Sequence, residues 1–331
     1  MKVKGINYDV GTKYTPGFIT RKDLDKEAIQ KEIRIIKAQL NCNAIRLYGE
    51  RLDKLIGCSK IAFENNLEVW FSPRFIDRTQ GETLKLIEKC AKEAEKLRKT
   101  NPKVTFTVGN EFTLDTKGFL EGETHDRRIQ SLVKGQTRNS NKQLNQFLKR
   151  LVPLVRKFFK GEITYASGFW EQVNWNILDI VGVNKYLTKW NKEKYVYQLQ
   201  ELKKIGKPVA ITEFGCGSYI GAADKGPIGH EIINWEKHEI KGNYRRSEKE
   251  QANYIKYLLE LFEKEDLFAA FVYTFIEPLY LYSENPKRDL DKASYNVVRV
   301  YPDGRIKPKE SFKVISNIIR PIKKMHDYSG Y

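Results

Sequence analysis

Two glutamates stand at points of the sequence where an apolar run ends abruptly in polar residues. Asn110-Glu111 follows the run 104–108, and Glu213 follows the run 209–212. Two carboxyl groups that face each other can share the work of breaking a bond: one protonates the departing oxygen, and the other attacks the carbon or activates water. Apolar surroundings can keep one of them protonated near neutral pH while the other stays ionised. Either glutamate alone could instead form an ion pair with Lys or Arg at the surface.

The elements that must position these glutamates are eight apolar runs rich in β-branched and aromatic residues. They span residues 3–8, 44–48, 68–72, 104–108, 163–167, 180–184, 209–212 and 270–275. Continuous apolar runs are typical of parallel strands covered on both faces. Between them, apolar residues recur at helical spacing, as at Ile29, Ile33, Ile36 and Leu40, which predicts helices with one buried face. Eight strand–helix units in series predict an α/β fold, a (β/α)8 TIM barrel that forms a single domain over residues 1–331.

Three long segments follow predicted strands four, seven and eight, at residues 112–138, 215–246 and 276–307. Long loops at the carboxyl ends of barrel strands are where the active sites of such barrels are built. A doubly wound sheet is the alternative fold. Its usual glycine-rich fingerprint does not follow the first strand, and Gly215-Cys216-Gly217 comes only after a late strand.

The positions of the two glutamates resemble those in the large clan A of retaining (β/α)8 glycoside hydrolases. Members of that clan carry Asn-Glu after the fourth strand and a second Glu after the seventh. The resemblance implies that Glu111 is the acid/base and Glu213 the nucleophile in cleavage of a β-glycosidic bond by a retaining double displacement. It equally accommodates transglycosylation, and it implies a carbohydrate substrate.

Further residues match this clan at strand ends. By resemblance, Asn110 binds the sugar hydroxyl next to the reacting carbon, Arg46 keeps Glu213 ionised, and Tyr186 hydrogen-bonds the nucleophile. From the residues alone, Arg46 could instead tie its strand end to Glu50, and Tyr186 could belong to the edge of the core.

Aromatic side chains near the predicted strand ends could stack on sugar rings or simply pack. Trp170, Trp190 and Trp235 follow strands five, six and seven. Many clan members place a tryptophan at the end of strand eight, where this chain has Phe275, so we expect Phe275 to stack in its place. Four acidic residues follow other strands and are expected to be rim charges unless they bind sugar hydroxyls: Asp9, Glu50, Glu171 and Glu277.

A second resemblance leads to a different interpretation. Residues 4–11 and 213–226 look like those of proteins labelled abortive phage infection proteins. Because one fold hosts many functions, the alternative is a non-catalytic barrel that binds a glycan or a phage component in phage defence.

Composition narrows the class of partner. The chain has 331 residues, 40% of them hydrophobic, with 59 Lys and Arg against 42 Asp and Glu, for a net charge of +17. The charges alternate in sign along helix-like stretches, which favours a solvated surface over a nucleic-acid interface. No apolar run is long enough to span a membrane, and the amino-terminal residues lack an apolar signal region, so we expect a cytoplasmic location.

The cysteines and histidines lack the spacing of metal ligands, so we predict no metal and no organic cofactor. The four cysteines form no C-x-x-C pair, and we expect free, buried thiols.

Overall fold

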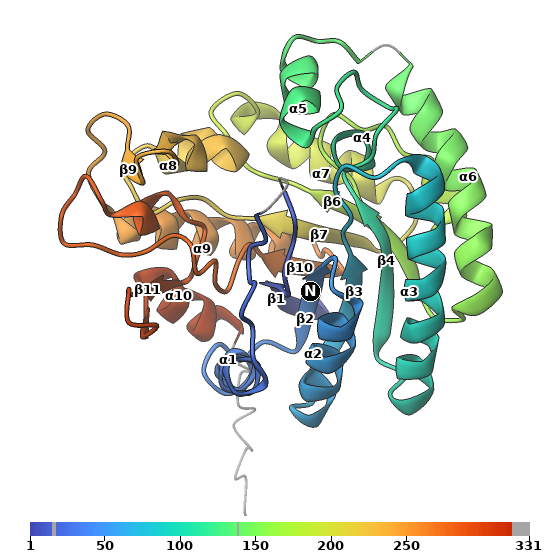
Figure 1. Cartoon of the computed structure of the whole chain (residues 1–331), viewed down its shortest axis with the longest axis horizontal. Helices are drawn as coiled ribbons and strands as arrows, with labels where there is room; N and C mark the ends of the chain where they lie inside the picture. The colour runs from blue at the N-terminus through green and yellow to red at the C-terminus, as the bar shows by residue number, and fades with distance from the viewer. Residues whose placement is uncertain (15–17, 138, 320–331) are drawn as a thin grey trace, which may run out of the picture.

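The centre of the molecule is a parallel sheet of eight strands (Figure 1). The computed structural model describes residues 1–14, 18–137 and 139–319. The strands are β1 (Val3–Asp9), β2 (Ala44–Gly49), β3 (Glu68–Pro73), β4 (Val104–Asn110), β5 (Ile163–Ala166), β6 (Val181–Asn184), β7 (Val209–Phe214) and β10 (Ala269–Val272). They pair in the order β5-β4-β3-β2-β1-β10-β7-β6.

The two strands at the ends of this order meet and close the sheet. Ser167 lies opposite Val183, and the Ser167 N–H donates to the Gly182 carbonyl at 3.0 Å. This contact joins β5 to β6 and confirms the predicted (β/α)8 barrel.

Helices lie around the outside of the strands (Figure 1). They are α1 (Lys26–Ala38), α2 (Leu52–Glu64), α3 (Gln80–Thr100), α6 (Ser140–Phe158), α7 (Tyr195–Lys203), α9 (Glu248–Lys264) and α10 (Glu310–Ile319). The predicted apolar face of the first helix is correct, because Ile29, Ile33 and Ile36 are all buried against the sheet. The fifth unit departs from the predicted alternation: β5 and β6 are joined by the 3-10 turn η1 (Trp175–Ile177) in place of an α-helix.

Side-chain caps explain where several of these helices begin. The Asp25 carboxylate accepts from the Ala28 N–H at 2.7 Å at the start of α1. Before α3, Thr79 and Glu82 form a reciprocal capping box. Such caps satisfy N–H groups that have no partner within the helix, and each typically contributes about 1 kcal/mol.

Apolar side chains fill the amino-terminal end of the barrel interior. The Trp70 and Phe271 rings lie 4.7 Å apart between centroids, and Phe271 lies so close to Gly5 that a Cβ there would come within 2.4 Å of the ring. We call this cluster the barrel plug; its members are Val3, Ala44, Trp70, Ile180, Ala210, Ala269 and Phe271. Since the plug closes this end, a site inside the barrel must lie at the carboxyl end of the strands.

The segments after β4, β7 and β10 are more regular than their sequences suggest. They contain α4 (Phe112–Asp115) and α5 (His125–Val133); α8 (Ala222–Lys225), η3 (Gly226–Ile232), β8 (Ile233–Asn234) and β9 (Glu239–Ile240); and η4 (Leu290–Ala293), β11 (Val298–Val300) and β12 (Ile306–Pro308).

An ion network joins the last two segments. Arg246 lies 2.9 Å from Asp289 and 2.6 Å from Asp291, and the fully buried Lys309 ammonium lies 3.0 Å from Asp291. These contacts give the long segments a fixed conformation.

Two expectations from composition can be compared with the structure. Cys42, Cys58, Cys90 and Cys216 are free and buried, as predicted. Among residues 1–14, 18–137 and 139–319, no helix has both the length and the apolar character needed to cross a membrane.

Candidate active site

Irregular strand pairing turns the key residues of β4 and β7 toward the barrel interior. The register between β4 and β5 shifts between Thr107 and Asn110, and the register between β6 and β7 shifts so that Asn184 pairs with Glu213. Successive side chains of a regular strand point to opposite faces. A shift in strand register changes the face toward which the following side chains point. Asn110 and Glu111 therefore both reach the amide of Asn184.

Arg46, on β2, is the centre of the polar interior. Its side chain is fully buried, and its Nη1 donates to Glu213 Oε1 at 2.9 Å and to Asn7 Oδ1 at 2.8 Å. Its Nη2 donates to Asn110 Oδ1 at 2.9 Å. A guanidinium presents several donors in a fixed plane, so one side chain holds groups from β1, β4 and β7 in place.

Glu111 has a different environment. Its Oε1 accepts from the neutral Asn184 amide at 2.9 Å. Burial, and to a smaller extent the nearby charge of Glu213, raise the pKa of the Glu111 carboxyl to about 8. Glu111 therefore holds a proton at neutral pH.

Hydrogen bonds link the two glutamates without a break. Glu111 bonds to Asn184, whose Nδ2 lies 3.3 Å from Asn110 Oδ1, and Asn110 in turn bonds to Arg46 and so to Glu213. The Nδ2 of Asn110 is buried and has no hydrogen-bond partner among the residues that the structure describes. The amide is thus free to donate to a bound molecule.

Tyr186 approaches Glu213 from the segment after β6. Its hydroxyl donates to Glu213 Oε2 at 3.3 Å, on the oxygen that Arg46 leaves open. Burial and the charge of Glu213 raise the pKa of Tyr186 well above its ordinary value. The phenol therefore keeps its proton and acts as a donor.

A second buried guanidinium lies after β3, where sequence reasoning assigned no role. Arg74 donates to both oxygens of Asp115, at 2.8 and 3.1 Å, and to the Tyr14 hydroxyl at 3.1 Å. Burial alone would raise the pKa of Asp115, but the charge of Arg74 offsets it and the pKa lies below its usual value. The charge of Arg74 also acts on Glu111, in the direction that lowers the pKa of that carboxyl.

Polar and aromatic groups line the mouth beside β1, β2 and β10. The Tyr48 hydroxyl donates to the Tyr273 hydroxyl at 3.1 Å, and Asp9 accepts from the Gly11 N–H at 2.9 Å. Asp9 is 2% exposed, so the expectation of a rim charge is wrong for it. Burial and then the charge of Asp9 raise the pKa of Glu277 to about 8.

The predicted aromatic platform is wrong at one position. Phe275 is completely buried and packs near Tyr8, with ring centroids 6.3 Å apart. Its N–H donates to the carbonyl of Asn7, on the neighbouring strand β1, at 3.0 Å, beyond the end of β10 at Val272. The Phe275 ring therefore belongs to the core and cannot stack on a substrate.

The three tryptophans at the mouth have different surroundings. Trp170 is partly buried and donates from Nε1 to Thr113 Oγ1 at 2.8 Å, two residues beyond Glu111. Trp235 is 39% exposed and packs edge-on against Tyr280. Trp190 is 64% exposed, and the Lys189 ammonium lies over its ring. Of the three, Trp170 is the one joined by a hydrogen bond to the segment that carries Glu111.

Sequence reasoning missed Asn7 and Asn184 as parts of the site. Asn7 donates to the Thr212 carbonyl at 2.9 Å, and the Thr212 hydroxyl donates to Asn184 Oδ1 at 2.7 Å. The sequence did carry a signal for both: each is an asparagine inside or at the end of an otherwise apolar strand. Because a buried amide needs hydrogen-bond partners, such a residue indicates a polar cluster in the interior.

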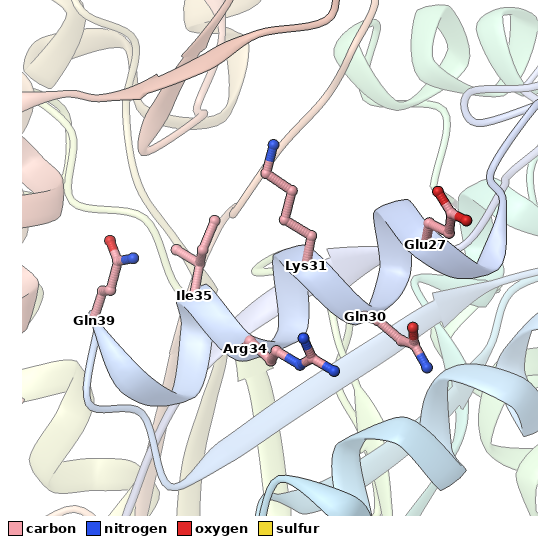
Figure 2. Close-up of a pocket in the computed structure, with 6 residues that line it drawn as sticks. All are labelled: Glu27, Gln30, Lys31, Arg34, Ile35 and Gln39. Carbon is pink, nitrogen blue, oxygen red and sulfur yellow. The ribbon is translucent and has the colours of Figure 1, made fainter.

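A surface depression also lies well outside this site. Figure 2 shows its lining side chains along α1, five from the helix and one from the residue that follows it: Glu27, Gln30, Lys31, Arg34, Ile35 and Gln39. They are long polar chains and one isoleucine in contact with solvent. Among the described residues, no three His, Cys, Asp or Glu side chains are grouped as a metal ion would require.

A parallel barrel with two linked carboxylates at the carboxyl ends of its strands is the arrangement that glycoside hydrolysis requires. The sequence model of Glycoside Hydrolase Family 113 matches residues 132–296, which include Tyr186 and Glu213 but not Glu111. This match supports a glycoside hydrolase.

Solved structures show the same fold. A Family 113 β-1,4-mannanase superposes with a TM-score of 0.63 at 17% identity, covering 96% of this chain and 99% of that one. A β-glucuronidase of Bacteroides uniformis gives a TM-score of 0.62 at 15% identity, covering 97% of this chain but 35% of that one. The search of curated proteins found no match. Neither the family match nor these structures supports the resemblance to abortive phage infection proteins.

Proposed function

We propose that this protein is a retaining glycoside hydrolase of β-linked glycans, with Glu213 as the nucleophile and Glu111 as the acid/base. The observation that carries the proposal is the unequal surroundings of two linked carboxylates. Glu213 is paired with the Arg46 guanidinium at 2.9 Å, whereas Glu111 is partly buried beside a neutral amide and has a pKa of about 8. One group is prepared to attack and the other to give a proton.

In the first step, a Glu213 oxygen attacks the anomeric carbon while the bond from that carbon to the leaving oxygen breaks. Glu111 donates its proton to that oxygen, so the aglycone leaves as a neutral alcohol. Arg46 and Tyr186 hold the Glu213 carboxylate in position for the attack. In this proposal Asn110 binds a sugar hydroxyl, which is supported by its buried Nδ2 having no hydrogen-bond partner among the described residues.

The covalent intermediate changes the charge beside Glu111. Once Glu213 is an ester it carries no charge, and one cause of the raised pKa of Glu111 disappears. Glu111, now deprotonated, takes a proton from water as the water oxygen attacks the anomeric carbon. The Glu213 oxygen leaves as a carboxylate, and both glutamates return to their starting states.

The first substrates to test are β-mannosides and β-glucuronides. They are the sugars named for the two enzymes with similar folds, a β-1,4-mannanase and a β-glucuronidase. Carbohydrate is the only partner proposed, and no observation favours the alternative of a non-catalytic binding protein.

The test measures activity and stereochemistry together. We expect the wild type to release sugar whose first-formed anomer is β, as followed by proton NMR during hydrolysis. Glu213→Gln and Glu111→Gln should each lose at least about 10²-fold in kcat. The matched control is Glu95→Gln, because Glu95 is a buried glutamate on the outer helix α3. A first-formed α anomer would contradict retention, and an active Glu213→Gln variant would contradict the assignment of the nucleophile.

A further inference from the structure

Glu111 has a backbone conformation that needs support. Its φ and ψ are 38° and 51°, in the left-handed region, and it immediately precedes the four-residue helix α4. This conformation is unfavourable for a residue with a side chain, because Cβ comes too close to the backbone. Surrounding contacts must therefore hold the backbone that aims the Glu111 carboxyl.

The support comes from β5 and the segment that follows it. The Phe112 N–H donates to the Tyr165 hydroxyl at 2.6 Å, and the Thr113 N–H donates to Glu171 Oε1 at 3.0 Å. These are the first two N–H groups of α4, which have no acceptor within the helix. Tyr165 and Glu171 thus cap the helix from a neighbouring strand and fix the residue before it.

Glu171 is the hub of these contacts. Its Oε1 accepts from the Thr113 N–H and from the Thr113 hydroxyl at 2.7 Å, and its Oε2 accepts from the Tyr165 hydroxyl at 2.8 Å and the Gly168 N–H at 3.0 Å. The side chain is buried, with 8% exposed, so the expectation of a rim charge is also wrong here. All four partners are neutral donors, which requires both oxygens to be acceptors.

The same cluster reaches an aromatic surface. Trp170 Nε1 donates to the Thr113 hydroxyl at 2.8 Å, and that hydroxyl donates onward to Glu171. Phe169, 72% exposed, packs edge-on against Trp170 with ring centroids 5.0 Å apart. The indole is therefore tied to the segment that carries the proposed proton donor.

We propose that Glu171 is a positioning residue for proton donation: it holds Glu111 in its left-handed conformation and, through Thr113, fixes the Trp170 indole relative to it. A leaving group that packs on Trp170 then meets the Glu111 carboxyl. The part that concerns proton donation rests on the proposed function, whereas the holding of α4 does not.

The kinetic test compares two leaving groups. A dinitrophenolate leaves without a proton, whereas a sugar or alkyl alcohol needs one. For Glu171→Gln, one oxygen becomes an NH₂ group that cannot accept. We expect kcat/KM for an alkyl or oligosaccharide substrate to fall about 10–100-fold, with less than about 3-fold change for the dinitrophenyl glycoside in the glycosylation step. Thr113→Val, which removes the hydroxyl between Trp170 and Glu171, should raise KM for the oligosaccharide more than it lowers kcat.

A second measurement needs no substrate. In Glu171→Gln, amide hydrogen exchange of Phe112 and Thr113 should become at least about 10-fold faster. The single remaining oxygen cannot both accept from the Thr113 N–H and hold the Tyr165 hydroxyl, which is the acceptor of the Phe112 N–H. Glu95→Gln is the matched control, since Glu95 also accepts a backbone N–H, from Lys160 at 3.0 Å, but on α3. It should leave both the exchange at Phe112 and the ratio between the two substrates unchanged.

The outcomes are separable. Equal losses on both substrates, or unchanged rates with unchanged exchange, would overturn the positioning role. If the wild type cleaves no β-glycoside, the proposed function fails, and the proposed coupling to proton donation fails with it. The exchange measurement still decides whether Glu171 holds the backbone around Glu111.

Discussion

Replacing Glu111 with glutamine should stabilise the protein, and increasingly so as the pH rises. Glu111 has an ordinary pKa of 4.5 when unfolded and a pKa of about 8 in the folded protein, raised by burial and by the charge of Glu213. Between these values the folded state binds more protons than the unfolded state. The contribution of Glu111 to the free energy of unfolding therefore falls as the pH rises from about 4.5 to about 8.

The size of the effect follows from the same two values. At about 1.4 kcal/mol per pH unit, the gap gives at most about 5 kcal/mol. Between pH 5 and pH 8 the same two pKa values allow about 3.5 kcal/mol, and because Glu111 keeps partial contact with solvent we expect about 2–3.5 kcal/mol over this range. Glutamine has nearly the same shape, and its carbonyl can still accept from Asn184, which isolates the loss of charge.

The assay is urea unfolding of the wild type and of Glu111→Gln at pH 5, 6, 7 and 8. Other titrating groups are common to both proteins, and those that do not interact with Glu111 cancel in the difference. Glu95→Gln is the matched control: the hydrogen bond from Arg98 lowers the pKa of Glu95 to about 2, so its difference from wild type should stay flat over this range. A flat difference for Glu111→Gln, or one that shrinks with rising pH, would refute the reasoning.

Three further predictions concern other parts of the molecule. If Glu111 is the proposed proton donor, the kcat/KM of the wild type should fall about tenfold per pH unit above about pH 8, where Glu111 loses its proton, as a pH–rate profile will show. Arg46→Met leaves the buried Glu213 carboxylate without its cation and should lower the free energy of unfolding by roughly 3–5 kcal/mol and abolish turnover. Urea unfolding and hydrolysis assays measure the two effects, and a stable, active variant would contradict this prediction. Phe271→Ala opens a cavity in the barrel plug and should cost roughly 3–5 kcal/mol of stability while KM stays within twofold, and a large change in KM would contradict the separation of plug and site.

Much of the barrel follows from local sequence, because a strand buried on both faces must be apolar. The run 104–108 predicted β4, and the polar pair directly after it predicted the position of Asn110 and Glu111 at the mouth. The inward direction of both side chains was not predictable, since it depends on the shifted pairing with β5. Register between strands is a property of two segments and is absent from the pattern of either one.

Residues of one type in similar sequence positions can have unlike surroundings. Glu111 and Glu171 both follow strands, yet Glu171 accepts four hydrogen bonds that hold the helix after Glu111. Phe275 follows the last barrel strand, but its N–H bonds to Asn7 of β1 and its ring is buried. In each case contacts from another element decide the environment, and these contacts cannot be derived from spacing along the chain.

The hydrogen-bonded line between the two glutamates crosses from one half of the chain to the other. Glu111, Asn110 and Arg46 come from the half that ends with β4, while Asn184 and Glu213 come from the half that begins with β5. Neither half-barrel contains both carboxylates, so the proposed hydrolysis requires the halves to associate in the native register. Enzymatic activity of this fold would then report on assembly itself: two separately expressed fragments, each inert, should become active on mixing to the extent that they reconstitute the closed sheet.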